Sequence, residues 1–229
     1  MLAYKNDPKL KRGFVREIEK HRKADQIEQG HYGKENGIWK GCAVACSLRS
    51  LAILDGEALQ TKYGDHALYE SKLGIPEWLA RLEDRIFEGL PVKDAKKWPS
   101  DFAKAIPVGA NLESVKWRFS AFLLKENIER VLALDINDGL KTLVVDAIRK
   151  VLAVHSSAIK TGQWDESAAW SAASAARSAA RSAESAAESA ARSAESAAES
   201  AARSAARSAE SAAYKRYARE LLHLLAKAK

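Results

Sequence analysis

Apolar residues recur with helical spacing along most of the chain. The spacing of three or four positions predicts helices over residues 7–29, 42–54, 65–73, from 76 onwards and 137–160. The residues at the ends of these segments support the same helices. Asp7 and Asp65 can cap helices, while Gly74 ends one helix and Pro76 begins the next. Apolar and polar residues do not alternate over any stretch long enough to predict a sheet. The pattern therefore predicts an all-α fold.

The C-terminal segment follows a regular repeat. Serine recurs from Ser167 to Ser211 at a mean spacing of about 3.67 residues, which is eleven residues in three helical turns. Arginine or glutamate precedes most of these serines, and alanine fills nearly all other positions. Asp165 can cap the start of the segment. We expect an Ala/Ser-rich helix, which would extend ~96 Å if it ran unbroken from Asp165 to Ala228.

This change of composition predicts two parts, a compact helical domain over residues 1–162 and a repeat helix over residues 163–229. Small side chains allow helices to approach closely, so we expect the repeat helix to associate with copies of itself. The alternative is a solvated single helix lengthened by repeat slippage. The residues expected to mediate self-association are Trp170, Ser174, Ser185, Ser196, Tyr214, Tyr217, Leu221 and Leu224.

The charge and the cysteine content indicate which binding partners and which cellular location to expect for the protein. The net charge is +7 and is spread without a block of like charges, which favours a small anionic partner over an extended nucleic-acid surface. Two cysteines four residues apart cannot form a disulfide framework. We expect no signal peptide and no membrane-spanning segment, and hence a cytoplasmic protein.

The candidate ligand site is the segment Trp39-Lys40-Gly41-Cys42. If a helix begins at Gly41, its free N–H groups and the Lys40 ammonium would attract an anion, and Trp39 would offer a stacking surface. This combination suits a phosphate or a nucleotide. The alternative is that the segment is a glycine turn leading into a tightly packed helix.

Other candidate chemistry is weaker. A thiol at a helix N-terminus can have a lowered pKa, so Cys42 could be a nucleophile, although such cysteines are more often core residues. A zinc site built from Cys42, Cys46 and His31 lacks the usual Cys-x-x-Cys spacing. We expect Glu83 and Asp84 on the solvated side of their helix. The histidines are expected at the surface or in caps: His21, His31, His66, His155 and His223. No catalytic residue, metal site or cofactor is assigned.

Several short segments of the sequence are similar to segments of a known group of proteins. Residues 21–30, the Gly-Cys-Ala-Val-Ala-Cys string of residues 41–46, and residues 74–84 and 98–109 resemble a family of uncharacterised bacterial and phage-encoded proteins. The repeat tail is similar to those of proteins assigned as immunity proteins of toxin systems. The resemblance implies a setting in host–phage conflict. It carries no catalytic residues.

We therefore expect a non-enzymatic, homo-oligomeric binding protein that sequesters an anionic, nucleotide-like immune signal. One alternative is a structural or protein-interaction scaffold built on the repeat helix. Another is a nucleotide-processing enzyme that acts through Cys42 or an unrecognised acid–base pair.

Overall fold

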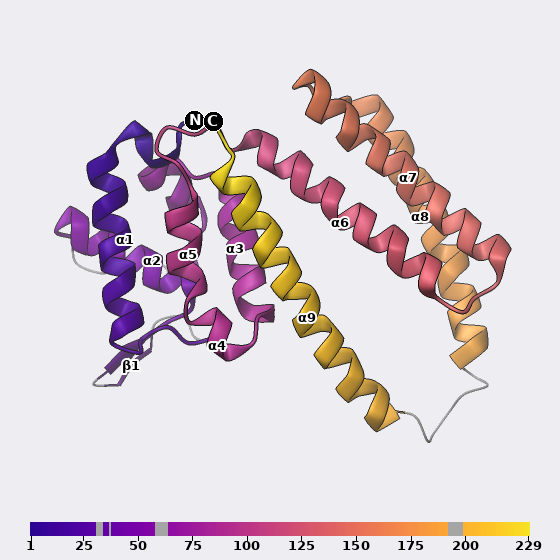
Figure 1. The fold of residues 1–229 in the computed structure, drawn as a ribbon, viewed down its shortest axis with the longest axis horizontal. Coiled ribbons are helices and arrows are strands. Elements are labelled where there is room, and N and C mark those ends of the chain that lie inside the picture. Colours follow the sequence, from indigo (N-terminus) through magenta and orange to yellow (C-terminus); the bar gives the residue numbers. More distant parts are fainter. Residues whose placement is uncertain (31–33, 37, 58–63, 192–198) are drawn as a thin grey trace. The chain divides into compact units, whose positions relative to one another are not determined.

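The computed structural model describes residues 1–30, 34–36, 38–57, 64–191 and 199–229. The chain divides into two compact units, one formed by residues 1–115 and 207–229 and the other by residues 116–206. The described elements are almost entirely helical, which confirms the all-α prediction (Figure 1). The units do not follow the predicted boundary after residue 162, because the last part of the tail belongs to the first unit.

The first unit begins with η1 (Ala3–Asn6) and the long helix α1 (Pro8–Lys23). Asp7 caps α1 as predicted, since its side chain accepts a hydrogen bond of 2.7 Å from the backbone N–H of Lys9. Phe14 and Ile18 lie on the buried face of α1. That face packs against α2 (Ala43–Asp55) and α5 (Trp98–Ala105).

Helix α2 is the most deeply buried helix of this unit. Its residues from Ala43 to Leu48 are all buried, and they are mostly small, so neighbouring helices can approach it from several sides. The prediction of a short buried helix here is confirmed. Gly56 ends the helix in a left-handed conformation with φ +68°.

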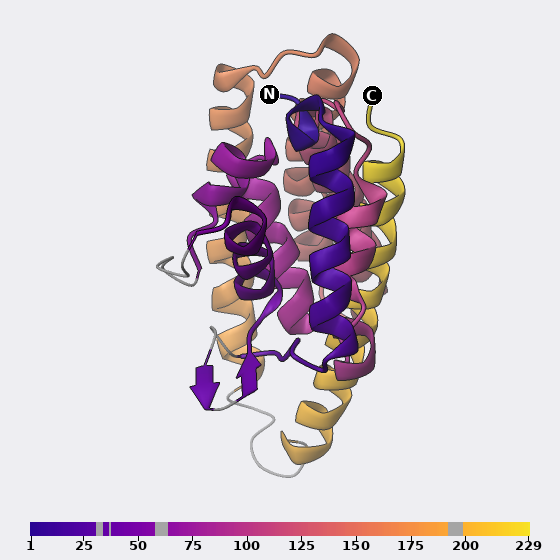
Figure 2. The same ribbon diagram turned by 90° about the vertical axis from the view of Figure 1, so that its left-hand side faces the viewer.

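Two short strands precede α2, and the sequence analysis did not predict them. Strands β1 (Lys34–Asn36) and β2 (Ile38–Lys40) pair antiparallel, with Glu35 opposite Trp39. They lie near the C-terminal end of α1 (Figure 2). Three residues per strand are too few to show an alternating pattern.

The next elements are η2 (Tyr69–Leu73), α3 (Glu77–Gly89), α4 (Val92–Ala95) and then α5. Gly74 separates η2 from α3 at φ +65°, and a Cβ there would lie 2.2 Å from the carbonyl oxygen of Leu2. Leu79 and Ile86 face the core, as the spacing predicts. Helix α6 (Glu113–Ala133) then leads into the second unit.

The second unit is dominated by a pair of helices that pack along each other, α7 (Asp138–Thr161) and α8 (Glu166–Ala191). The side chain of Asn137 caps α7, and Gly162 ends it. Asp165 caps α8 as predicted, by accepting a hydrogen bond of 2.9 Å from Ala168. Buried alanines, including Ala158 of α7 and Ala172 of α8, allow close approach. The first half of the repeat thus packs within its own chain.

The last helix, α9 (Glu199–Ala226), ends in the first unit. Leu221 is fully buried there, and the carbonyl oxygen of Lys229 accepts a hydrogen bond of 2.7 Å from Asn111. The expectation that Leu221 mediates contact between copies is therefore corrected, because this side chain is buried in the core of its own chain. Tyr214, Tyr217 and Leu224 are half-buried, whereas Trp170 and Ser174 are exposed. The side chain of Ser185 and all of Ser196 lie outside the described residues.

Substitution of Gly89 by alanine should weaken the docking of α9. A Cβ at this position would lie 2.2 Å from the ring of Tyr214, so the ring must move. We expect a loss of about 1–3 kcal/mol in the free energy of unfolding, measured by chemical denaturation. Gly13→Ala is the control, because a Cβ there meets only the flexible end of Leu54, at 3.1 Å. Equal effects of the two substitutions would contradict the packing described for Gly89.

Candidate functional site

The fold gives the four predicted site residues different environments. Trp39 is only 5 % exposed, and its ring lies 4.6 Å from the Arg49 guanidinium and 5.2 Å from the His21 ring. A Cβ on Gly41 would lie 2.8 Å from Cβ of Ala45 and 2.9 Å from the Trp39 ring. Cys42 is fully buried. These three residues thus form the tightly packed turn that was the alternative interpretation. Ligand binding by them stays a prediction.

Lys40, by contrast, faces a pocket of about 290 Å³. We call it the lysine pocket. It lies among the loop after α1, strand β2, the end of α3, and α4. Its lining residues are Asp25, Ile27, Glu28, Gln29, Lys40, Phe87, Val92, Ala95 and Lys96. An apolar wall with a few charged groups is typical of small-molecule sites, and the volume is at the lower end of their range, about 300 Å³.

Both lysines of the pocket pair with carboxylates. Lys40 Nζ lies 3.0 Å from Glu28 Oε2, and Lys96 Nζ lies 2.5 Å from Asp25 Oδ1. The hydrogen bond from Lys96 lowers the pKa of Asp25. All four side chains are partly or largely exposed, so water screens both pairs, which contribute little to stability and open easily.

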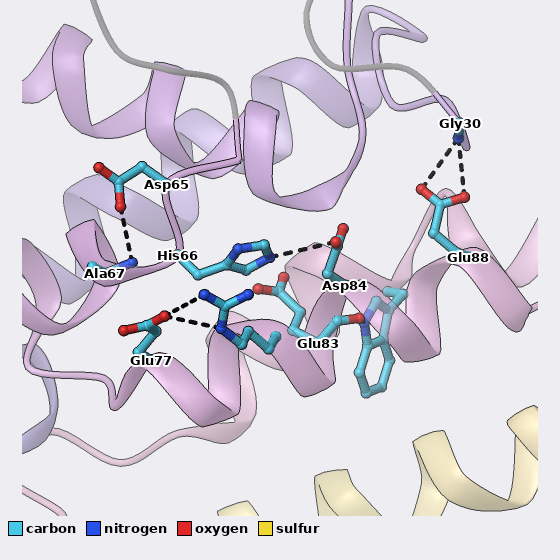
Figure 3. A network of polar contacts seen from close by, with 10 residues as sticks. Gly30, Asp65, His66, Ala67, Glu77, Glu83, Asp84 and Glu88 are labelled. Carbon is cyan, nitrogen blue, oxygen red and sulfur yellow. Dashed lines mark hydrogen bonds and ion pairs between the residues drawn. The ribbon is translucent and has the colours of Figure 1, made fainter.

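A single glutamine fastens one wall of this pocket. Gln29 Nε2 donates hydrogen bonds to the carbonyl oxygens of Phe87 at 2.7 Å, Leu90 at 2.8 Å and Glu88 at 3.2 Å. These carbonyls belong to the end of α3, where helical partners are lacking. The backbone N–H of Gly30 adds a hydrogen bond of 3.0 Å to the Glu88 carboxylate (Figure 3). The loop after α1 is thereby fixed to α3.

A second polar group lies inside the same unit, around Glu83. The sequence pattern predicted Glu83 and Asp84 on the solvated side of α3, and for Glu83 this was wrong. Glu83 is 1 % exposed. A signal was present in the sequence, because Glu83 lies four residues after Leu79 and three before Ile86, within the apolar stripe.

Burial dominates the electrostatics of Glu83 and raises its pKa to about 8. The nearby Asp84 charge raises this pKa further, while the Tyr69 hydroxyl lowers it. Tyr69 is itself buried, and burial raises its pKa. Glu83 is thus a carboxyl group that changes its charge near neutral pH.

His66 and Asp84 form the edge of this group. His66 Nε2 lies 3.4 Å from Asp84 Oδ2, and the two side chains are 12 % and 15 % exposed (Figure 3). The preceding residue, Asp65, accepts a hydrogen bond of 3.2 Å from Ala67, which fixes the turn that carries His66. His66 and the buried His21 therefore differ from the expectation of surface histidines, whereas His31 lies outside the described residues.

The two cysteines are core residues. Burial raises the pKa of Cys42 to about 12, and it outweighs the opposing backbone hydrogen bonds from Ala45 and Val44 at the start of α2. A thiolate at Cys42 is therefore disfavoured at neutral pH, which counts against the nucleophile hypothesis. Cys46 Sγ donates to the carbonyl oxygen of Gly41 at 3.4 Å.

Within the described ranges, His, Cys, Asp and Glu side chains do not gather in any group of three or more that could hold a metal ion. The described helices also include none whose length and apolar character would allow it to span a bilayer.

Glu83→Gln tests the buried carboxyl through the pH dependence of stability. A carboxyl whose pKa is raised on folding binds more protons in the folded state, so the wild-type protein should lose stability as pH rises from 4.5 towards 8. Relative to the wild type, the variant should gain up to ~1.4 kcal/mol per pH unit over this interval, measured by urea unfolding. A difference that does not vary with pH would contradict the assignment.

Comparison of the chain with protein-family models, with curated proteins and with solved structures gives no match.

Proposed function

We propose that the chain binds a small anionic, nucleotide-like molecule in the lysine pocket. The observation that carries this proposal is the pair of lysines, Lys40 and Lys96, on the lining of one pocket with an apolar wall. A phosphate group would replace Glu28 and Asp25 as the partner of the two ammonium groups. Since the existing ion pairs are exposed and weak, this exchange costs little.

The pocket also limits how the ligand is held. Trp39 is buried beside Arg49 and His21, so apolar contact with a ligand would come from Val92, which is 65 % exposed, and not from stacking on Trp39. The described lining has no hydroxyl, thiol or imidazole group. The lysines and carboxylates of the lining are paired with each other, which supports a role in charge pairing with a bound anion, and hence a sequestering protein over a nucleotide-processing enzyme. The resemblance of the strings at residues 21–30, 41–46, 74–84 and 98–109 to phage-encoded proteins supports sequestration of an immune signal in the cytoplasm.

Lys40→Ala and Lys96→Ala should each weaken binding of adenosine monophosphate about tenfold, because each removes one charged partner of the phosphate, worth ~1.5 kcal/mol. Isothermal titration calorimetry at low salt measures the affinity. Lys93→Ala is the matched control, since Lys93 is exposed on α4 but does not line the pocket. Unchanged affinity in both pocket variants would remove the site assignment.

A second candidate function is a protein-interaction scaffold formed by α7 and α8, with another copy of the chain as partner. It is favoured by Trp170, which is 71 % exposed on α8. Separately, a groove of about 560 Å³ runs between the two helices, and Trp170 is not among its lining residues. The groove residues are Lys150, Ala153, Val154, Ser157, Asp165, Ala168, Ser171, Ala172 and Ala175. Large exposed aromatic side chains are enriched where proteins associate.

If α7 and α8 mediate self-association, Trp170→Ala should shift the protein from an oligomer to a monomer in sedimentation velocity experiments. Leu143→Ala is the control, because it also removes an exposed apolar side chain, but from α7 and with a smaller exposed surface than Trp170. A wild-type protein that sediments as a monomer at all concentrations would eliminate this candidate and leave the pocket proposal intact.

A further inference from the structure

Polar side chains from three elements converge inside the first unit. Ser47 comes from α2, Tyr69 from η2, and Glu83 from α3. All three are at most 1 % exposed. The Tyr69 hydroxyl lies close enough to Ser47 and Glu83 for hydrogen bonding to both to affect its pKa, although no hydrogen bond of full geometry joins them, so the three groups are neighbours. With the His66–Asp84 pair, these side chains form what we call the Glu83 cluster.

Several polar atoms of the Glu83 cluster are buried without a hydrogen-bond partner among the described residues. They are Ser47 Oγ, Tyr69 OH, Glu83 Oε2 and Asp84 Oδ1. Buried polar atoms in native proteins are nearly always satisfied, and ordered water is the usual partner where protein atoms are lacking. Tyr69 neighbours both Ser47 and Glu83, and Asp84 acts on Glu83, so ordered water at this site would have several of these oxygens as partners.

The cluster also has a solvent-facing edge. His66 and Asp84 are 12 % and 15 % exposed, whereas Glu83 lies behind them at 1 %. Figure 3 shows the contact that joins the His66 ring and the Asp84 carboxylate, and the Asp84 charge in turn acts on Glu83. Asp84, whose charge acts on Glu83, thus belongs to the partly exposed edge of the cluster.

We propose that the Glu83 cluster is a hydrated acid–base site, in which ordered water bridges the unpartnered oxygens and Glu83 exchanges a proton with solvent at the His66–Asp84 edge. In this step the O–H bond of the Glu83 carboxyl breaks and the bridging water accepts the proton. That water releases a proton towards solvent, and a carboxylate remains. The proposal does not depend on the lysine pocket.

Glu83 is the buried acid of the cluster that titrates near neutral pH, because burial keeps the neighbouring hydroxyl and thiol groups protonated. The titratable groups that face it are Tyr4 of η1, Cys46 of α2, Tyr69 of η2 and Asp84 of α3. Burial raises the pKa of Tyr4, Cys46 and Tyr69, so these three stay protonated. From α5, the indole Nε1 of Trp98 donates a hydrogen bond of 3.0 Å to the backbone carbonyl of Glu83 and does not titrate.

Infrared difference spectroscopy of the full chain tests the proton. At pH 7 we expect the carbonyl stretch of a protonated carboxyl, with a titration midpoint near 8. This band should be absent in Glu83→Gln and retained in Glu77→Gln, the control, because Glu77 is a partly exposed glutamate of the same helix that pairs with Arg81. If the band is missing in the wild type, or survives in Glu83→Gln, Glu83 is not the proton carrier and the proposal fails.

Two further variants should move the midpoint in opposite directions. Asp84→Asn removes a charge that raises the Glu83 pKa, so the midpoint should fall. Tyr69→Phe removes a hydroxyl that lowers the Glu83 pKa, so the midpoint should rise.

A crystal structure should show ordered water within hydrogen-bond distance of Tyr69 OH and Glu83 Oε2. A dry cluster, or shifts of the same sign, would overturn the proposal. Binding of adenosine monophosphate in the lysine pocket is measured in parallel and tests the other site separately.

Discussion

The first unit depends on the close packing around α2. A Cβ on Gly41 would meet both Ala45 and the Trp39 ring, so close contact with these two side chains fixes the turn into the helix. The small side chains of α2 let α1, α3 and α5 pack against it. One consequence is that Lys40 remains outside the packed turn and reaches a pocket. Another is that Ser47, one turn further along, lies in the interior.

Helix α3 links the two polar sites of this unit. Phe87 lines the lysine pocket, and Glu83 lies one turn earlier on the same helix face. The end of the helix is held by Gln29 and Gly30, while its middle packs against buried polar groups from α2 and η2. An enclosed carboxyl and an open charged pocket are therefore built on one rigid element, though their chemistry differs.

The helices and their caps could be predicted from the sequence because the signals are local. Asp7 and Asp165 cap helices as expected, and Gly74 and Pro76 separate η2 from α3. The buried position of Glu83 could have been inferred from its place in the apolar stripe, but a charged residue there conflicts with the usual preference for the surface. The pocket beside Lys40 could not be predicted, since it requires the loop after α1, strand β2 and α4 to meet through contacts distant in sequence. The packing of Leu221 in the first unit was missed for the same reason.

The eleven-residue period of the tail has a consequence for how its length can change. Eleven residues complete three turns of an α-helix, so insertion or loss of one unit returns every later residue to nearly its former face. Duplication or deletion within the repeat would therefore preserve the alanine face by which α8 packs on α7, and alter only the reach of the helix. The segment can therefore change in length while its packing surface stays the same.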